Sequence, residues 1–171
     1  LIELDSGVGI NLGSQSNVVC TDSRISPLLV WESVCEEAFP EFYGYQSCSR
    51  EVVFMDSRLD LVLLRPNGKF FIEVKSVNLV RNGTALFPDA PTVRGRRHLG
   101  ALVEAVKQGY RSAMVFVVQR NDADKFSVNQ SQDPDFGIAI QWAATQGVEI
   151  YAYKCRITST DIKIVARIPL C

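Results

Sequence analysis

Residues 59–76 read LDLVLLRPNGKFFIEVKS, two apolar runs separated by Asn67-Gly68. Asn-Gly between apolar runs is the strongest short-range signal for a β-hairpin. Because side chains alternate between the faces of a strand, Glu73 and Lys75 are predicted to share one face of the second strand, while Asp60 stands in the first. Charged groups among apolar strands are costly unless they are paired or bind a metal, so some compensating arrangement is expected.

The order of these groups, an aspartate, a hairpin and then Glu-x-Lys, matches the PD-(D/E)xK nuclease signature. In that chemistry Asp60 and Glu73 would be ligands of a hard divalent cation, usually Mg²⁺, with Mn²⁺ as an alternative. Lys75 would orient or deprotonate the attacking water, or stabilise developing charge. The same pattern also fits a structural ion pair between Lys75 and one of the two carboxylates.

Composition narrows the classes of protein. The chain has 171 residues, of which 47% are hydrophobic and 22% charged, which is typical of one globular domain. The net charge is -1 and the sequence pI is about 5.9, so any nucleic-acid site must be a local patch rather than a basic coat. No apolar run approaches the roughly 20 residues of a membrane helix, so no membrane partner is expected.

The chain has five cysteines, an odd number, and no CxxC motif. Neither a disulfide framework nor a zinc site is therefore indicated. Reduced thiols predict an intracellular protein, cytoplasmic in a bacterium or organellar in a eukaryote.

Further along the chain, periodicity predicts an alternation of helices and strands. A helix beginning at Ser26-Pro27 is expected to bury Leu28, Trp31, Cys35 and Phe39. The whole order, helix, three strands, helix, strand, helix and two strands, predicts an α/β fold of the restriction-endonuclease-like type, a mixed sheet flanked by helices. The remaining expectations are a short strand at 8–12, a strand at 51–55, loops at 81–91 and 121–133, a helix capped by Thr92, a buried strand at 113–119, a helix at 135–147, and strands at 149–156 and 161–168.

The densest basic cluster, Arg94, Arg96, Arg97 and His98, opens the helix that Thr92 is expected to cap. A helix N-terminus attracts anions through its free N–H groups and its dipole. Arginine suits phosphate, so these four residues are predicted to contact the phosphate backbone of a nucleic acid. The alternative is a solvated basic turn paired with nearby acidic residues.

Several segments together resemble one family. They are EVKSV at 73–77, FPDAPTVRGRRHL at 87–99, AVKQGYR at 105–111, VFVVQR at 115–120 and GVEIYAYK at 147–154. This ordered set closely resembles the sugar fermentation stimulation protein A family, also described as a DNA/RNA nuclease family. The resemblance runs from about residue 50 to the end of the chain.

The resemblance implies more about sites and domains. Glu51 aligns with a glutamate of the family's EV segment and becomes a further candidate for the metal site; the alternative is an ordinary ion-pair partner for Arg50 or Arg58. Glu32 is another, because nucleases of this fold often add a glutamate from their first helix. The family has an N-terminal OB-like domain, so residues 1–24 are expected to be its junction and residues 25–171 the nuclease-like domain.

The expected function is that of a metal-dependent nuclease that hydrolyses phosphodiesters of DNA or RNA, with Mg²⁺ as the cofactor. A non-catalytic, sequence-nonspecific DNA-binding regulatory protein is the alternative. A small-molecule or interaction module on the same scaffold also stays open, because a fold alone does not fix a function.

Overall fold

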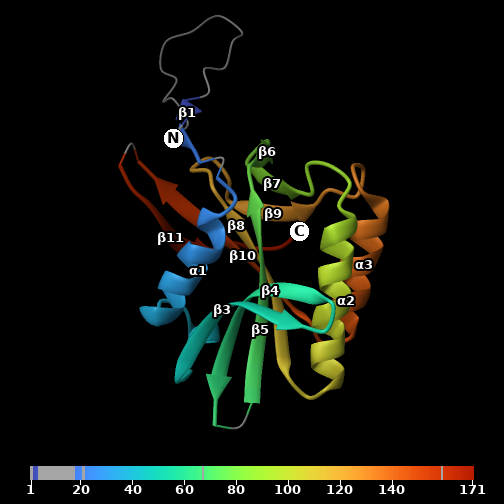
Figure 1. Ribbon diagram of the computed structural model, residues 1–171. Helices are drawn as coiled ribbons and strands as arrows, with labels where there is room; N and C mark the ends of the chain where they lie inside the picture. The colour runs from blue at the N-terminus through green and yellow to red at the C-terminus, as the bar shows by residue number, and fades with distance from the viewer. Residues whose placement is uncertain (1, 4–17, 21, 67, 159) are drawn as a thin grey trace, which may run out of the picture.

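The computed structural model describes residues 2–3, 18–20, 22–66, 68–158 and 160–171, and its centre is a mixed six-stranded sheet (Figure 1). The strand order is β11-β10-β8-β5-β4-β3. β5, β8 and β10 run parallel, and the other neighbours are antiparallel. The strands are β3 (Ser47–Phe54), β4 (Ser57–Arg65), β5 (Gly68–Val77), β8 (Arg111–Val118), β10 (Glu149–Ile157) and β11 (Ile162–Arg167).

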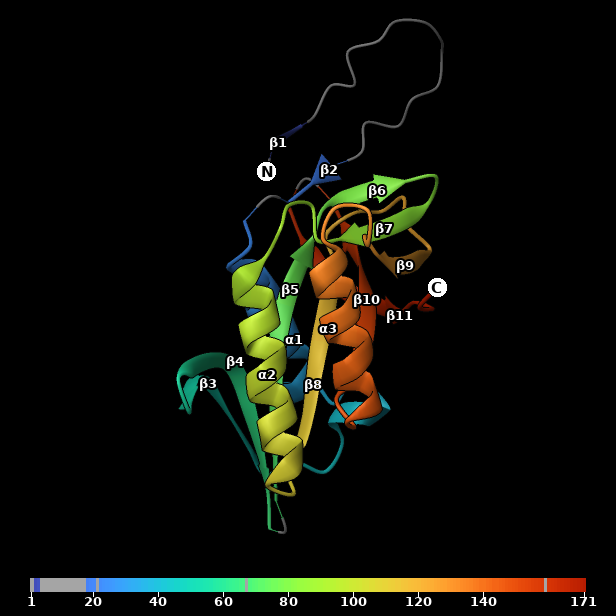
Figure 2. The same cartoon turned by 90° about the vertical axis from the view of Figure 1, so that its right-hand side faces the viewer.

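Helices cover both faces of this sheet. α1 (Ile25–Cys35) lies on one face, and α2 (Val93–Lys107) and α3 (Pro134–Thr145) lie side by side on the other (Figures 1 and 2). Residues 113–118 of β8 are all fully buried, as expected for a strand covered on both faces. The predicted α/β architecture, a mixed sheet flanked by helices, is therefore confirmed.

The predicted hairpin is also confirmed, since Arg65 faces Gly68 and Leu61 faces Ile72 across β4 and β5. The pairing of the two strands stops at Leu61, while β4 continues alongside β3. Leu59 packs in the cluster under α2, whereas Leu61 packs in the cluster under α1. Alternate residues of a flat strand share a face, so this split means that β4 bends between them, and Figure 1 shows β3 and β4 curling away from β5.

The buried stripe predicted for α1 is wrong at two of its four positions. Trp31 and Phe39 are partly buried against the core, but Leu28 is 39% exposed and Cys35 is exposed, and the fully buried side chains lie elsewhere on the helix. The physical reason is that residues 28–31 read LLVW, so the helix is apolar around much of its circumference and its periodicity does not single out one stripe. The buried residues are Ser26, Leu29, Val30, Ser33 and Val34.

Two segments predicted as loops carry strands. β6 (Leu79–Arg81) and β7 (Thr84–Phe87) form a hairpin, and β9 (Lys125–Val128) joins β7 in a three-stranded sheet. Asn82 and Gly83 both have positive φ, 49° and 72°, which is the backbone that an Asn-Gly hairpin turn requires. The strands are only three and four residues long, too short for alternation to mark them.

The remaining elements agree with expectation at their cores. Thr92 caps α2, its hydroxyl accepting the Gly95 N–H at 3.0 Å. The strand expected at 8–12 lies outside the described residues. All five cysteines are free thiols. Among the described residues, no helix is long and apolar enough to cross a membrane. The smaller elements are β1 (Ile2–Glu3), β2 (Val18–Val19) and the 3₁₀ helix η1 (Pro40–Phe42).

Candidate functional site

A cleft of about 900 Å³ opens where β4 leaves β5, between the starts of α1 and α2. It brings the predicted Asp60, Glu73 and Lys75 together with Glu51 and Arg94. Its other lining residues come from α1 and the residues before it, from β3 and β5, and from β7. They are Ser23, Arg24, Pro27, Leu28, Arg50, Val74, Ser76 and Phe87.

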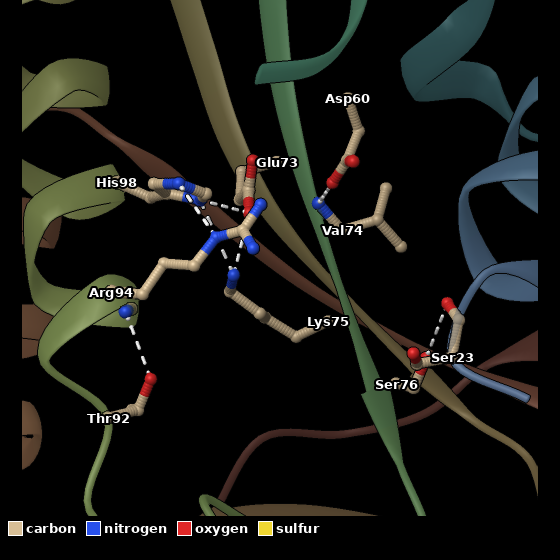
Figure 3. Close-up of polar contacts among 10 residues, drawn as sticks. Ser23, Asp60, Glu73, Val74, Lys75, Ser76, Thr92, Arg94 and His98 are labelled. Carbon is tan, nitrogen blue, oxygen red and sulfur yellow. Dashed lines mark hydrogen bonds and ion pairs between the residues drawn. The ribbon is translucent and has the colours of Figure 1, made fainter. Parts of the chain in front are cut away.

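Asp60 is held in the opening between the two strands. Its Oδ2 accepts the main-chain N–H of Val74 at 2.7 Å, a group that β4 no longer pairs (Figure 3). Burial, with repulsion from the Glu73 carboxylate second, raises the pKa of Asp60 to about 7. Near neutral pH the Asp60 side chain is therefore present in both its protonated and its ionised form.

Glu73 is only 2% exposed and is held on one side only. Its Oε1 contacts the ammonium Nζ of Lys75 at 2.6 Å and Nδ1 of His98 in a short hydrogen bond (Figure 3). Its Oε2 has no hydrogen-bond partner. Burial on its own would raise the pKa of Glu73, but the His98 hydrogen bond and the Lys75 charge outweigh it, so the pKa lies below its ordinary value.

These two carboxylates fit a hard divalent cation. A buried carboxylate oxygen without a donor is costly, and an oxygen-seeking cation is a group that would satisfy it. Within the described ranges, no three His, Cys, Asp or Glu side chains are grouped so as to hold a metal by themselves. Mg²⁺ is commonly held by one or two carboxylates, with water and substrate phosphate completing its shell, and the Asp60–Glu73 pair matches that need.

The two further candidate ligands lie in different places. Glu51 lines the cleft on β3, between Arg50 and Val52, whose partners on β4 are Leu61 and Leu59, and its carboxylate is 3.8 Å from the guanidinium of Arg58. Glu32 is exposed on α1 and is not among the residues lining the cleft. The structure thus places Glu51 in the lining of the same cleft, without grouping it with Asp60 and Glu73 as a third ligand, and does not place Glu32 there.

The basic cluster predicted as one phosphate-binding surface is divided. Arg94 is exposed and lines the cleft, and Arg97 is exposed. Arg96 points to α3, where it forms an ion pair with Asp133 at 3.1 Å. His98 is 1% exposed, so the prediction that it contacts a phosphate is corrected. Residues 94–98 span little more than one helical turn, and successive side chains are about 100° apart, so these four side chains cannot all point in one direction.

Sequence reasoning missed the contact between His98 and Glu73. One signal was available, since Arg94 and His98 are four residues apart and such residues share one helix face. The structure shows that pairing: Arg94 Nε donates to His98 Nε2 at 3.5 Å. What no local pattern gives is that this face of α2 packs against the Glu-x-Lys segment of β5.

Comparisons with known proteins agree with one another. A family model described as the sugar fermentation stimulation protein RE domain matches residues 25–161. Sugar fermentation stimulation protein homologs from Desulforamulus reducens and Moorella thermoacetica are 42% and 43% identical over 90% and 91% of this chain. This chain spans 64% and 67% of their lengths. A solved structure of Pyrococcus furiosus SfsA in complex with Ca²⁺ is 25% identical, with a TM-score of 0.81 over 94% of this chain and 75% of that one.

Proposed function

This chain belongs to the sugar fermentation stimulation protein family, and we propose that it is a metal-dependent nuclease hydrolysing phosphodiesters of DNA or RNA. The observation that carries the proposal is the pair Asp60 and Glu73 in one cleft beside Lys75, with Oε2 of Glu73 unpartnered. Burying two carboxylates and an ammonium costs desolvation free energy, which a purely structural role would not readily explain.

Two further observations support this reading. The similar Pyrococcus furiosus protein is described in complex with Ca²⁺, an ion that takes the same oxygen ligands as Mg²⁺. The sheet of this chain, with its bent acidic hairpin at the opening between α1 and α2, has the layout expected of a restriction-endonuclease-like fold. We therefore propose that the fold is restriction-endonuclease-like.

The roles of the residues follow from their surroundings. Asp60 and Glu73 would hold Mg²⁺ or Mn²⁺, and Glu51 stands where it could join them. A bound divalent cation would act as a Lewis acid on the phosphate and lower the pKa of a bound water. Lys75 is 14% exposed and donates to Glu73, so as an ammonium it orients that carboxylate and presents its remaining N–H donors to the cleft.

The nucleic acid would enter over the arginines of the cleft. Arg94 is exposed at the start of α2, and Arg50 lines the opposite wall, its guanidinium 5.5 Å from the ring centre of Trp31. Arg24 is already paired with Asp22 at 2.9 Å. Contacts to phosphates rather than to bases predict binding with little sequence preference.

The test is a cleavage assay on labelled single- and double-stranded DNA and RNA with Mg²⁺, Mn²⁺ or EDTA. The proposal expects cleavage with a divalent cation, none with EDTA, and loss of at least about 100-fold in Glu73→Gln, which keeps the side chain's shape but removes its charge. Asp89→Asn, an exposed acid outside the cleft, is the matched control and should cleave normally.

Binding without cleavage by the unsubstituted protein would instead favour the regulatory alternative. Cleavage that Glu73→Gln leaves intact would place the chemistry outside this cleft.

A further inference from the structure

We propose that His98 is a positioning residue: through its Nδ1–H it fixes the Glu73 carboxylate, so that Oε1 is occupied and Oε2 remains free for a cation. The inference rests on the metal-dependent function proposed above and deepens it. It concerns a residue that sequence analysis assigned to phosphate and that the fold buries completely.

The contacts form a line from the surface to the acidic pair. Arg94 Nε donates to Nε2 of His98 at 3.5 Å, and Nδ1 of His98 bonds to Glu73 Oε1 (Figure 3). Lys75 Nζ lies 2.6 Å from the same oxygen and 3.4 Å from Nδ1. The imidazole is 1% exposed, so water does not compete for either ring nitrogen.

Both ends of this line set the same tautomer. A guanidinium has only donors, so the nitrogen that it faces, Nε2, must be the acceptor. An ionised carboxylate has only acceptors, and Glu73 Oε1 lies closer to Nδ1 than the Lys75 ammonium at 3.4 Å does, so Nδ1 carries the proton. The geometry therefore directs a hydrogen on His98 Nδ1 at Glu73 and leaves Nε2 to accept from Arg94.

The consequence falls on the two oxygens of Glu73. Oε1 receives two donors, one from His98 and one from Lys75, while Oε2 receives none. A carboxylate fastened at one oxygen cannot rotate to exchange its two oxygens without breaking both bonds. Residues that orient a metal ligand in this way commonly change metal affinity by about 10–100-fold when they are replaced.

A pair of substitutions separates the two contacts of His98. In His98→Asn the amide nitrogen can take the place of Nδ1 and still donate to Glu73, while the Arg94 contact is lost. In His98→Gln the amide reaches the place of Nε2, so the Arg94 contact is retained and the Glu73 donor is lost. Mn²⁺ alone is titrated into each protein, with free Mn²⁺ followed by electron paramagnetic resonance, and thermal melts identify the folded fraction.

The proposal expects Mn²⁺ affinity to fall about 10–100-fold in His98→Gln and to remain closer to the unsubstituted value in His98→Asn. Equal affinity in all three proteins, or equal losses in both variants, would overturn it. If the unsubstituted protein binds Mn²⁺ and His98→Gln binds it as tightly, only this inference fails. If the unsubstituted protein binds no Mn²⁺, the proposed metal-dependent function fails together with it.

A second measurement needs no substitution. His98 is the one histidine in the sequence, so the side-chain ¹H–¹⁵N spectrum of histidine-labelled protein reports this ring alone. The expected spectrum shows a protonated Nδ1 and a bare Nε2, with the Nδ1 signal shifting when Mg²⁺ is added. A proton on Nε2, or a spectrum that saturating Mg²⁺ leaves unchanged, would contradict the proposal.

Discussion

Two carboxyl groups in the same cleft experience opposite environments. Glu73 is kept ionised by His98 and Lys75 despite its burial. Asp60 receives one main-chain N–H, and burial with the nearby Glu73 charge raises its pKa to about 7. At neutral pH the pair thus has one ionised member and one whose charge depends on pH.

Asp60→Asn should stabilise the protein at pH 8 in EDTA. The unfolded aspartate loses its proton near pH 3.9, whereas the folded one keeps it until about pH 7. Between these values the folded state binds more protons, so the free energy of unfolding falls as pH rises. Asn lacks this penalty, and the expected gain is on the order of 2–4 kcal/mol at pH 8 and near zero at pH 4.

Urea unfolding at pH 4, 6 and 8 measures this effect. Asp60→Ala is the control, because it also removes the charge but leaves the Val74 N–H without its acceptor. It should be less stable than Asp60→Asn by about 1 kcal/mol. A gain for Asp60→Asn that is the same at every pH would contradict the raised pKa.

At the scale of elements, the first turn of α2 is fitted closely to its neighbours. Asp133 accepts the Thr92 N–H at 2.7 Å and the Phe136 N–H at 3.0 Å, so one carboxylate holds the beginnings of α2 and α3 together. Arg96 completes this joint from α2. The direction in which α2 presents Arg94 and His98 to the cleft therefore depends on α3.

Two glycines of α2 should respond oppositely to alanine. A Cβ on Gly95 would lie 2.8 Å from Thr92 Cγ2 and 3.1 Å from Phe136, so Gly95→Ala should destabilise the protein by about 1–3 kcal/mol. A Cβ on Gly100 meets nothing within 4 Å, and Gly100→Ala should stabilise by about 0.5–1 kcal/mol. Thermal melts of the two variants make the comparison, and shifts of the same sign would refute it.

Arg96→Ala should affect stability rather than nucleic-acid binding. Its partner Asp133 is only 3% exposed, so losing the Arg96 side chain should lower the free energy of unfolding by about 1–3 kcal/mol. The loss is smaller than for a fully buried pair because Arg96 itself is partly exposed. Urea unfolding and a binding titration of single-stranded DNA test the two sides. Weaker DNA binding with unchanged stability would instead indicate that Arg96 contacts a phosphate of the nucleic acid.

How far the sequence predicted these elements depended on the length of each pattern. The β4–β5 hairpin, the buried β8 and the capped α2 follow from turn chemistry, a continuous apolar run and a helix cap. The sequence pattern did not predict the small sheet β6-β7-β9, because tertiary pairing rather than local pattern defines such short strands. The Glu-x-Lys motif located the acidic pair, but His98 depends on how α2 docks against β5, which spacing does not encode.

The whole molecule has a net charge of -1, so its attraction for a polyanion must come from a few placed cations. Ten of the 18 lysines and arginines form ion pairs within the described fold, among them Arg111 with Glu149 and Arg120 with Asp122. Two of the arginines for which the described residues show no ion pair, Arg94 and Arg50, line the cleft.

Arg94→Ala should weaken DNA binding and make it less sensitive to salt. Losing one phosphate contact should reduce the magnitude of the slope of log affinity against log salt by about 0.7–0.9. Arg156→Ala, an exposed arginine on β10 outside the cleft, is the matched control and should leave the slope unchanged. Titrations at several salt concentrations measure both, and equal slopes in all three proteins would exclude Arg94 as a phosphate contact.

The hydrogen bond from Val74 to Asp60 also bears on how this molecule could change over generations. The same carboxyl group that faces the cleft fills a place in the sheet where β4 has turned away. A descendant that abandoned the chemistry could not freely discard the side chain, because a small apolar replacement would leave an amide of β5 unsatisfied. Asparagine escapes that constraint by keeping the acceptor while losing the charge. Homologues that have lost the activity are therefore expected to carry asparagine at the position of Asp60.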